Sequence, residues 1–339
     1  MSITDQITRL QNAKASIKTS IENKGVTVPE NTKLDGYPAL IDNIQTGSGE
    51  ETTSSYWPDF FEAKMLKGTA QESGRYLFFG AYIRDENDKN LIENLDVSNM
   101  VSINNMFTQL GVYYRNTNIK DLDFTRWNVS KCEDFQSAFH NSCYIDSINI
   151  SGWDFSKAKS IYRMFDSSCF KTIDMSNCNT STIKDFSNLF AYSKYLTSID
   201  MTGCNTSNAT NVGSMFNNSA ELTIVIGDLD LSNLTNGLFP ASYSNPFYKC
   251  PKLETIYLKN IYKNCTMTNA SKWCINLGDT KVKDECLISI INELPDLIND
   301  KGLTATNKIV LTLPKTNTLT AEQVKVATDK GWTVANTTY

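Results

Sequence analysis

The sequence predicts an α/β solenoid in which units of about 25 residues stack on one another. The first observation is a column of serines, at Ser98, Ser130, Ser156, Ser181, Ser207 and Ser232. After a first gap of 32 residues, their spacings are 26, 25, 26 and 25 residues. The second is a phenylalanine nine residues after each of the first five serines, at Phe107, Phe139, Phe165, Phe190 and Phe216. The sixth unit lacks two residues, and we expect Phe239 to take this position there.

Each unit is expected to begin with a short strand. Two apolar residues with a polar residue between them stand eight and six residues before the serine, as in Ile199 and Met201. This alternation is typical of a strand with one buried face. After the serine, apolar residues follow at steps of three, as in Ile183, Phe186 and Leu189. Such steps predict a short helical or 3₁₀ segment.

A single unit cannot bury its own apolar face, but a stack of units can. We therefore expect parallel strands about 4.8 Å apart, and a ladder of phenylalanine rings that each contribute on the order of 2 kcal/mol by burial. Asp or Asn stands two residues before each serine, at Asp96, Asn128, Asp154, Asn179, Asn205 and Asp230. These short side chains are predicted to form turns by bonding to the backbone, and to bond along the column.

Residues 1–46 are predicted to form an N-terminal helical module for anchoring or oligomerisation. Apolar residues recur there at heptad steps, at Ile3, Ile7, Leu10, Ile17 and Ile21, with Lys14 in the same seam. Isoleucine at both seam positions favours trimers. The seam is shorter than three heptads, so an intramolecular hairpin against residues 34–44 is the alternative. Residues 47–58, within and after the stretch QTGSGEETTSS, are predicted to be a flexible linker.

Residues 59–270 are assigned to the solenoid, including its own N-terminal cap. Residues 271–339 depart from the repeat and predict an α/β cap over the last apolar face. We expect a helix over 282–299, a strand over 308–313, a helix over 320–330 and a strand over 331–334. Thr320, with Gln323 three residues later, predicts a capping box at the start of the second helix.

The units INISGWDFSKAKSIYRMF and IDMSNCNTSTIKDFSNLF resemble the BspA-type leucine-rich repeats of bacterial surface proteins, over roughly residues 91–260. The resemblance implies a structural and binding scaffold of the kind found in adhesins and phage proteins. The N-terminal stretch KGVTVPENTKLDGYPALIDNI, with the helix before it, resembles a short module of phage tail and baseplate proteins. In such proteins this end docks onto the virus particle.

Composition argues against several classes of function. The chain of 339 residues has a net charge of −5 and no basic run, so we expect no nucleic acid partner. The first residues lack the apolar region of a signal peptide, and no segment is apolar enough to insert into a membrane. The protein is therefore expected to fold in a bacterial cytoplasm. The nine cysteines lack the paired spacing of zinc ligands and are interpreted as buried thiols, so no metal or other cofactor is expected.

Ligand contacts are expected where the repeat is broken, because insertions in a solenoid collect on one rim. The candidates are Tyr113, Tyr114 and Arg115 in the first insertion, and Tyr243 and Phe247 in the last. Trp127 and Trp153 are interpreted as core residues, because their column holds cysteine or leucine in other units. The single histidine, His140, is interpreted as a solvated loop residue.

A glycan-processing enzyme is a further alternative. Asp123, Asp174 and Asp200 form a column, and paired carboxylates can hydrolyse sugars. Their repetition at the period of the units favours a structural ladder. We therefore expect no enzymatic activity.

The anchor-like end, the linker and the repeat body together predict a bacteriophage virion structural protein, part of a tail fibre, baseplate or head fibre. Its solenoid is expected to serve as the receptor-binding region in host attachment, with a host-surface glycan or protein as ligand. Other virion proteins are expected to bind the N-terminal module, and a homo-oligomer, with a trimer favoured, is expected to give avidity. The alternative is a bacterial surface adhesin or another interaction protein with the same repeats.

Overall fold

The computed structural model describes residues 73–80, 83, 85–111, 119–235, 244–266, 273–303 and 309–336, and a few positions before them. The chain divides into two compact units, Met1–Leu66 and Lys67–Tyr339. In the first unit, Ile21 is helical and buried. The other four residues of the expected heptad seam and the expected linker lie outside the described residues, so both stay predictions.

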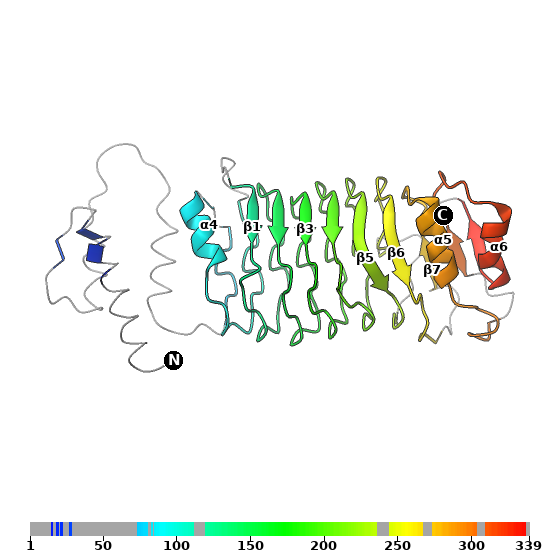
Figure 1. The fold of residues 1–339 in the computed structure, drawn as a ribbon, viewed down its shortest axis with the longest axis horizontal. Coiled ribbons are helices and arrows are strands. Elements are labelled where there is room, and N and C mark those ends of the chain that lie inside the picture. Colours follow the sequence, from blue (N-terminus) through cyan, green and yellow to red (C-terminus); the bar gives the residue numbers. More distant parts are fainter. Residues whose placement is uncertain are drawn as a thin grey trace. The chain divides into compact units, whose positions relative to one another are not determined.

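The second unit contains a parallel β-solenoid (Figure 1). Its sheet has the order β1-β2-β3-β4-β5-β6, and we call one turn of the solenoid a rung. The strands are β1 (Asp121–Asp123), β2 (Ser147–Asn149), β3 (Thr172–Asp174), β4 (Ser198–Asp200), β5 (Ile224–Asp230) and β6 (Thr255–Lys259). Leu122 lies opposite Ile148, which lies opposite Ile173, and all three are buried. The predicted parallel stacking and alternating burial are therefore confirmed.

The segment after each strand is not helical, contrary to the prediction from its three-residue steps. It consists of consecutive turns with a left-handed residue at every fourth position, such as Arg163 and Ser167 at φ 58° and 60°. The N–H of Met164 donates within its own rung, to Ile161 O at 3.2 Å. The next N–H, of Phe165, donates to Leu189 O in the following rung at 3.0 Å. Because successive N–H groups donate in turn within the rung and to the next rung, the backbone hydrogen bonds are formed without a helix. The expected α/β solenoid is therefore a β-solenoid with few helices.

A ladder of seven phenylalanines runs through the core. Their rings stack at centroid distances of 4.9 to 6.1 Å, with interplanar angles of 3° to 13°. The members are Phe78, Phe107, Phe139, Phe165, Phe190, Phe216 and Phe247. The predicted ladder is confirmed, but Phe247 takes the position that was expected for Phe239. Phe239 itself lies outside the described residues.

The Asp or Asn column forms a turn in each unit, as predicted. In all six units the side-chain Oδ1 accepts a hydrogen bond from the serine N–H, at 2.9 to 3.4 Å. Asn179 Nδ2 also donates to Asp154 Oδ1 at 2.8 Å. The column therefore shapes each rung, and at this pair it also joins two rungs.

Helix α4 (Glu86–Glu93) lies beside β1. Asp85 caps it, because its carboxylate accepts hydrogen bonds from the N–H groups of Asn87 and Asp88. The indole N–H of Trp127 donates to Ile92 O at 3.1 Å. This hydrogen bond and the ion pair of Lys89 with Asp121, at 2.5 Å, join the helix to the first rungs of the six-stranded sheet.

A second parallel sheet follows the solenoid, with the order β7-β8-β9. Its elements are β7 (Cys274–Asn276), α5 (Asp284–Glu293), β8 (Val310–Thr312), α6 (Ala321–Asp329) and β9 (Thr333–Ala335). The expected helices and strands are present, although α5 is shorter than predicted, and Thr320 and Gln323 form the predicted capping box. Helix α5 contacts β6, and Lys281 N donates to Leu253 O at 2.9 Å. None of the helices in the described segments has the length and apolarity that a membrane span requires.

Candidate functional site

The residues predicted to contact a ligand are only partly described. Tyr113, Tyr114, Arg115 and Tyr243 lie outside the described residues. Phe247 is 2% exposed, and its ring stacks on Phe216 at 6.1 Å. It is therefore a core residue, which corrects the prediction that it contacts a ligand. The insertion in this unit precedes the ladder position and so moves the ladder phenylalanine further along the chain.

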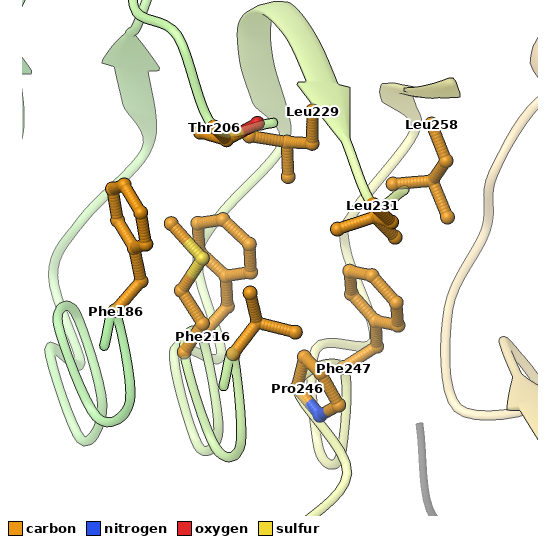
Figure 2. A pocket seen from close by; sticks show the side chains of 10 residues that line it. Phe186, Thr206, Phe216, Leu229, Leu231, Pro246, Phe247 and Leu258 are labelled. Atoms are coloured by element: carbon orange, nitrogen blue, oxygen red, sulfur yellow. The ribbon is translucent and has the colours of Figure 1, made fainter. Parts of the chain in front are cut away.

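The core next to Phe247 contains a small apolar gap (Figure 2). Its volume is about 10 Å³, and Phe216, Leu231 and Leu258 are among the side chains around it. A gap of this size holds at most about one water molecule. The register between β5 and β6 shifts nearby, between Ile224 and Asp228. The gap is therefore a packing irregularity and not a ligand site.

The carboxylates considered for sugar hydrolysis each close a turn. Asp123, Asp174 and Asp200 accept a hydrogen bond from the N–H two residues further on, at 2.8 to 2.9 Å. This is the structural role that their regular repetition favours. Within the described residues, no group of three or more His, Cys, Asp or Glu is placed to hold a metal ion.

Two further columns direct hydrogen-bond donors into the core. Trp153 donates its indole N–H to Phe124 O at 2.8 Å, and in the next rung the Cys178 thiol donates to Ile150 O at 3.2 Å. Tryptophan and cysteine thus donate to equivalent backbone carbonyls in adjacent rungs. The prediction that the tryptophans are core residues is confirmed. The second column donates to the carbonyl of the ladder phenylalanine one rung earlier; its donors are Ser142, Ser193, Ser219 and Cys250.

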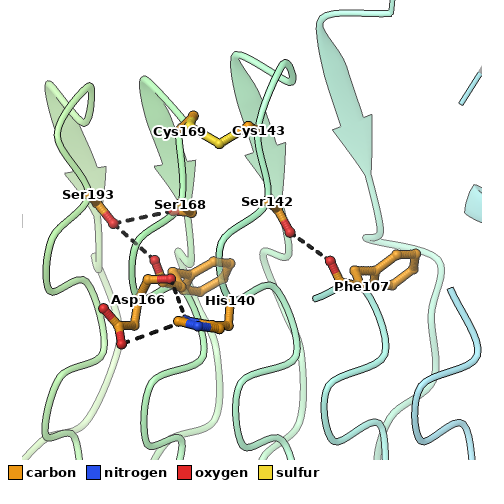
Figure 3. The surroundings of a disulfide bond; sticks show 9 residues. Phe107, His140, Ser142, Cys143, Asp166, Ser168, Cys169 and Ser193 are labelled. Atoms are coloured by element: carbon orange, nitrogen blue, oxygen red, sulfur yellow. Dashed lines mark hydrogen bonds and ion pairs between the residues drawn. A yellow bond between two sulfur atoms is a disulfide. The ribbon is translucent and has the colours of Figure 1, made fainter. Parts of the chain in front are cut away.

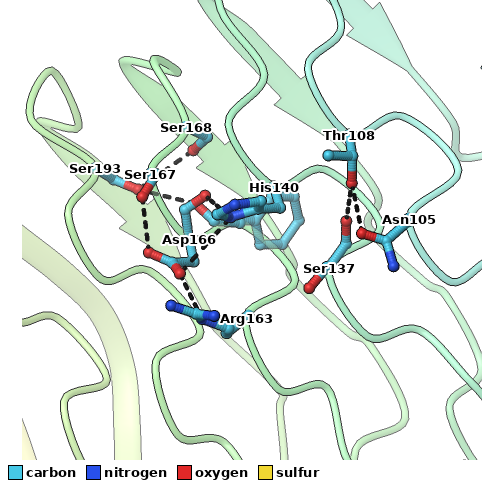
Figure 4. Close-up of polar contacts among 10 residues, drawn as sticks. Asn105, Thr108, Ser137, His140, Arg163, Asp166, Ser167, Ser168 and Ser193 are labelled. Atoms are coloured by element: carbon cyan, nitrogen blue, oxygen red, sulfur yellow. Dashed lines mark hydrogen bonds and ion pairs between the residues drawn. The ribbon is translucent and has the colours of Figure 1, made fainter. Parts of the chain in front are cut away.

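The single histidine belongs to a polar cluster and is not the solvated loop residue that was expected (Figure 4). His140 Nδ1 lies 2.9 Å from Asp166 O and 3.6 Å from Asp166 Oδ2. The Asp166 side chain is 1% exposed, and Arg163 Nε lies 2.7 Å from its Oδ2. Ser167 donates its hydroxyl to Asp166 Oδ1 at 3.0 Å. The cluster holds a buried carboxylate between the side chains of Arg163 and His140, and it joins the rungs of His140 and Asp166.

Cys143 and Cys169 form a disulfide between adjacent rungs (Figure 3). Their Cα atoms are 4.6 Å apart. This corrects the expectation that all nine cysteines are buried thiols. The two cysteines occupy one column of the repeat, so their separation of 26 residues places them side by side.

The other seven cysteines are free, and six of them are buried. Burial raises the pKa of Cys132, Cys250 and Cys274 to about 12 and that of Cys265 to about 11. These thiols stay protonated near neutral pH. Since thiolate is the reactive form of cysteine, they are packing residues and not nucleophiles.

The consecutive turns form an outward surface that we call the turn face. It is formed by the exposed side chains of residues 75–80, 104–111, 136–141, 162–167, 187–192, 213–218 and 246–249, while the ladder phenylalanines in these ranges are buried. Tyr76, Phe79 and Tyr192 on this face are 48%, 45% and 41% exposed. Tyr195, just beyond one turn segment, is 58% exposed.

Cations lie over three of the tyrosine rings of the turn face. Arg163 lies 5.6 Å from the ring centroid of Tyr162, and Lys249 lies 5.2 Å from that of Tyr248. Arg75 and Tyr76 form the third pair, at 5.2 Å. Exposed aromatic rings and arginine are the side chains most enriched in protein interfaces.

The outward side chains of β1 to β4 are different, since all of them are Asp, Asn, Ser or Thr. The turn face is therefore the aromatic surface of the described solenoid. The sequence predicted ligand contacts in the insertions and not on this face. The available signal was a tyrosine within three residues of a ladder phenylalanine, as at Tyr76, Tyr162 and Tyr192.

A family model described as "Mycoplasma protein of unknown function, DUF285" matches residues 76–193 and 146–250. The two matches together cover more than half of the chain, and they span the ladder from Phe78 to Phe247. Searches found no significant match among curated proteins or among solved structures. The match and the β-solenoid agree with the resemblance to BspA-type repeats, while the phage-like stretch lies before the matched residues. The chain belongs to the family of Mycoplasma proteins of unknown function, DUF285.

Proposed function

We propose that this chain is a non-enzymatic interaction protein whose solenoid attaches to a surface ligand through the turn face. The exposed aromatic rings of that face, at Tyr76, Phe79 and Tyr192, carry the proposal. Most other repeated side chains are committed to the ladder, to turns or to hydrogen bonds within the core. A scaffold whose repeated side chains have structural roles, and which carries exposed aromatic rings, suits a binding function better than a catalytic one.

The rigidity of the scaffold supports this function. Stacked rungs hold the aromatic side chains at multiples of about 4.8 Å. Several weak contacts at fixed positions bind cooperatively to a repetitive ligand such as a surface glycan. The Cys143–Cys169 disulfide also supports a role outside the cytoplasm, because disulfides persist in oxidising surroundings such as a cell or virion surface.

The test of this function is Tyr192→Ala combined with Tyr195→Ala in the full chain. We expect cell or glycan binding to weaken about tenfold or more, because exposed aromatic residues at interfaces commonly contribute above 1 kcal/mol each. Binding is measured by flow cytometry on intact bacteria and on an immobilised panel of surface glycans. Leu91→Ala combined with Ile226→Ala, at positions 50% and 41% exposed outside the turn face, is the matched control and should bind as the unchanged chain does. Equal losses in both variants, or no binding by the unchanged chain, would contradict the proposal.

A narrower proposal is that the chain is a virion component, anchored by residues 1–46, whose solenoid attaches the phage to its host. The stretch KGVTVPENTKLDGYPALIDNI and the expected heptad seam support it. The other specific form is a bacterial surface adhesin. Detection of the chain on bacterial cells that carry no phage would favour the adhesin, and antibody labelling of phage particles would favour the virion component.

The mass of the full chain, compared with that of a chain beginning at Tyr56, tests the anchoring part of this proposal. We expect a trimer for the full chain and a monomer for the shorter one, because isoleucine seams favour trimers. Light scattering measures both masses. Two monomers would show that the seam packs within its own chain, and the proposed oligomeric anchor would then fail.

The C-terminal sheet is proposed to act as the cap of the solenoid. Its helix α5 contacts β6, where Ile256 and Leu258 are fully buried. Without such cover, the last rung would expose its apolar face.

A further inference from the structure

A cleft of about 660 Å³ lies where the last rungs meet the C-terminal sheet. Four separate segments line it: 218–220, 248–251, 278–281 and 315–316. Its volume falls within the range of roughly 300 to 1,000 Å³ that is usual for small-molecule sites. Two of these segments follow β7 and β8 and stand outside the repeat. Their side chains are therefore not required by any column of the solenoid.

The cleft carries an excess of positive charge. Lys249, Lys281 and Lys315 are exposed at its lining, against the single carboxylate of Asp279. Within the described part of the chain, none of these three lysines forms an ion pair. Lys252, which does not line the cleft, pairs with Glu221 at 2.5 Å. Because the whole chain has a net charge of −5, this local surplus marks a place where an anion is attracted.

Several parts of the lining are held in place by contacts within the protein. Lys249 Nζ lies 5.2 Å from the ring centroid of Tyr248, and Lys281 N donates to Leu253 O at 2.9 Å. Asn218 N donates to Tyr248 O at 2.9 Å, which joins the two rungs of the cleft. A site on fixed backbone loses less entropy when it binds a ligand.

The rest of the lining is a mixture of apolar and hydrogen-bonding groups. Ala220, Tyr248 and Pro251 provide apolar surface, and Asn218 and Asp279 provide an amide and a carboxylate. This combination suits a sugar ring, whose C–H face is apolar and whose hydroxyls both donate and accept. Sugar hydroxyls can donate hydrogen bonds to the carboxylate of Asp279, whereas a sulfate or a fully ionised phosphate has no proton to donate.

A second cleft, of about 400 Å³, provides a contrast. Its Lys301 Nζ donates to Lys263 O at 2.7 Å and to Cys265 O at 3.1 Å. Its Glu293 accepts a hydrogen bond from Asn260 N at 2.9 Å. These charged groups are already bound within the protein, whereas the lysines of the first cleft are not ion-paired.

We infer that the first cleft binds an acidic saccharide, a uronic or sialic acid residue of a surface glycan. The carboxylate of the sugar lies among Lys249, Lys281 and Lys315, its apolar face packs against Tyr248, and its hydroxyls bond to Asp279. The inference rests on the proposed function, because it names the ligand class of an attachment protein. The cleft shares Asn218, Tyr248 and Lys249 with the turn face and so extends that surface.

The test is calorimetric titration of the full chain with sialyllactose and with oligogalacturonate, with lactose as the neutral probe. We expect an acidic saccharide to bind and lactose not to bind. Lys281→Ala combined with Lys315→Ala should weaken acidic binding about tenfold or more, since it removes two of the three positive charges that attract the sugar carboxylate. Lys157→Ala combined with Lys184→Ala makes the same change in net charge on exposed positions away from the cleft and should leave binding unchanged.

Three outcomes would overturn the inference. They are no binding of either acidic probe, an equal loss in both double variants, and displacement of the saccharide by inorganic phosphate at equal concentration. Binding to intact cells that depends on Tyr192 and Tyr195 would keep the proposed function even then. Loss of all binding to cells and glycans would overturn both.

Discussion

Replacing Phe165 with alanine is expected to lower the free energy of unfolding by about 3 to 5 kcal/mol. The Phe165 ring is fully buried and stacks on Phe139 at 5.3 Å and on Phe190 at 5.7 Å. Backbone hydrogen bonds fix the rungs on both sides, including Phe165 N to Leu189 O at 3.0 Å. The neighbours therefore cannot collapse into the space, and a cavity remains.

Urea unfolding followed by circular dichroism measures this loss. Tyr192→Ala is the control, because Tyr192 lies in the rung of Phe190 but is 41% exposed. Its effect should stay within about 0.5 kcal/mol. A loss below about 1 kcal/mol for Phe165→Ala would mean that the rungs close over the missing ring, contrary to the cavity cost expected for aromatic truncation.

Gly227→Ala is expected to destabilise the protein by on the order of 4 kcal/mol, as the sum of backbone strain and overpacking. Gly227 has φ 101°, a conformation that L residues rarely adopt. A Cβ there would lie 2.8 Å from Met201 C and O and 2.9 Å from Thr202 N. These are backbone atoms that follow β4, so they cannot rotate away as a side chain would.

Gly152→Ala is the matched comparison. Gly152 also has a positive φ, of 76°, but its Cβ would meet no atom within 4 Å. Only the left-handed backbone penalty of about 1 to 2 kcal/mol should remain. Thermal unfolding of both variants separates the two costs. Equal shifts in Tm would show that the approach of Gly227 to β4 relaxes freely and that the predicted overlap is absent.

The fold could be predicted well where one residue type repeats in one column. Phenylalanine at a constant offset located the ladder, and Ile148 and Ile173 located paired strands. The turns were predicted as helical segments because an apolar residue at every third position fits both a short helix and a series of turns. The distinguishing signal lies in the residues between, since asparagine tolerates the left-handed region. Asn141 and Asn188 do occupy it, at φ 53° and 55°.

The candidate site could be predicted less well, because surfaces are made by residues that are distant in the chain. Spacing of 26 residues, close to the unit length, was sufficient to place Cys143 beside Cys169, although their column was interpreted as one of thiols. The cleft combines segments near residues 218, 249, 279 and 315. Two of them lie beyond the repeat, so no column relates their positions, and only the folded chain brings their lysines together.

The disulfide between rungs has a mechanical consequence. A stack held mainly by contacts between neighbouring rungs peels one rung at a time when its ends are pulled apart. The covalent link between Cys143 and Cys169 excludes the 26-residue span between them from that extension. It withholds roughly 90 Å of contour length, at about 3.3 to 3.6 Å per residue. Under tension, the residues between the two cysteines therefore bear no load, which passes through the disulfide instead of through backbone hydrogen bonds.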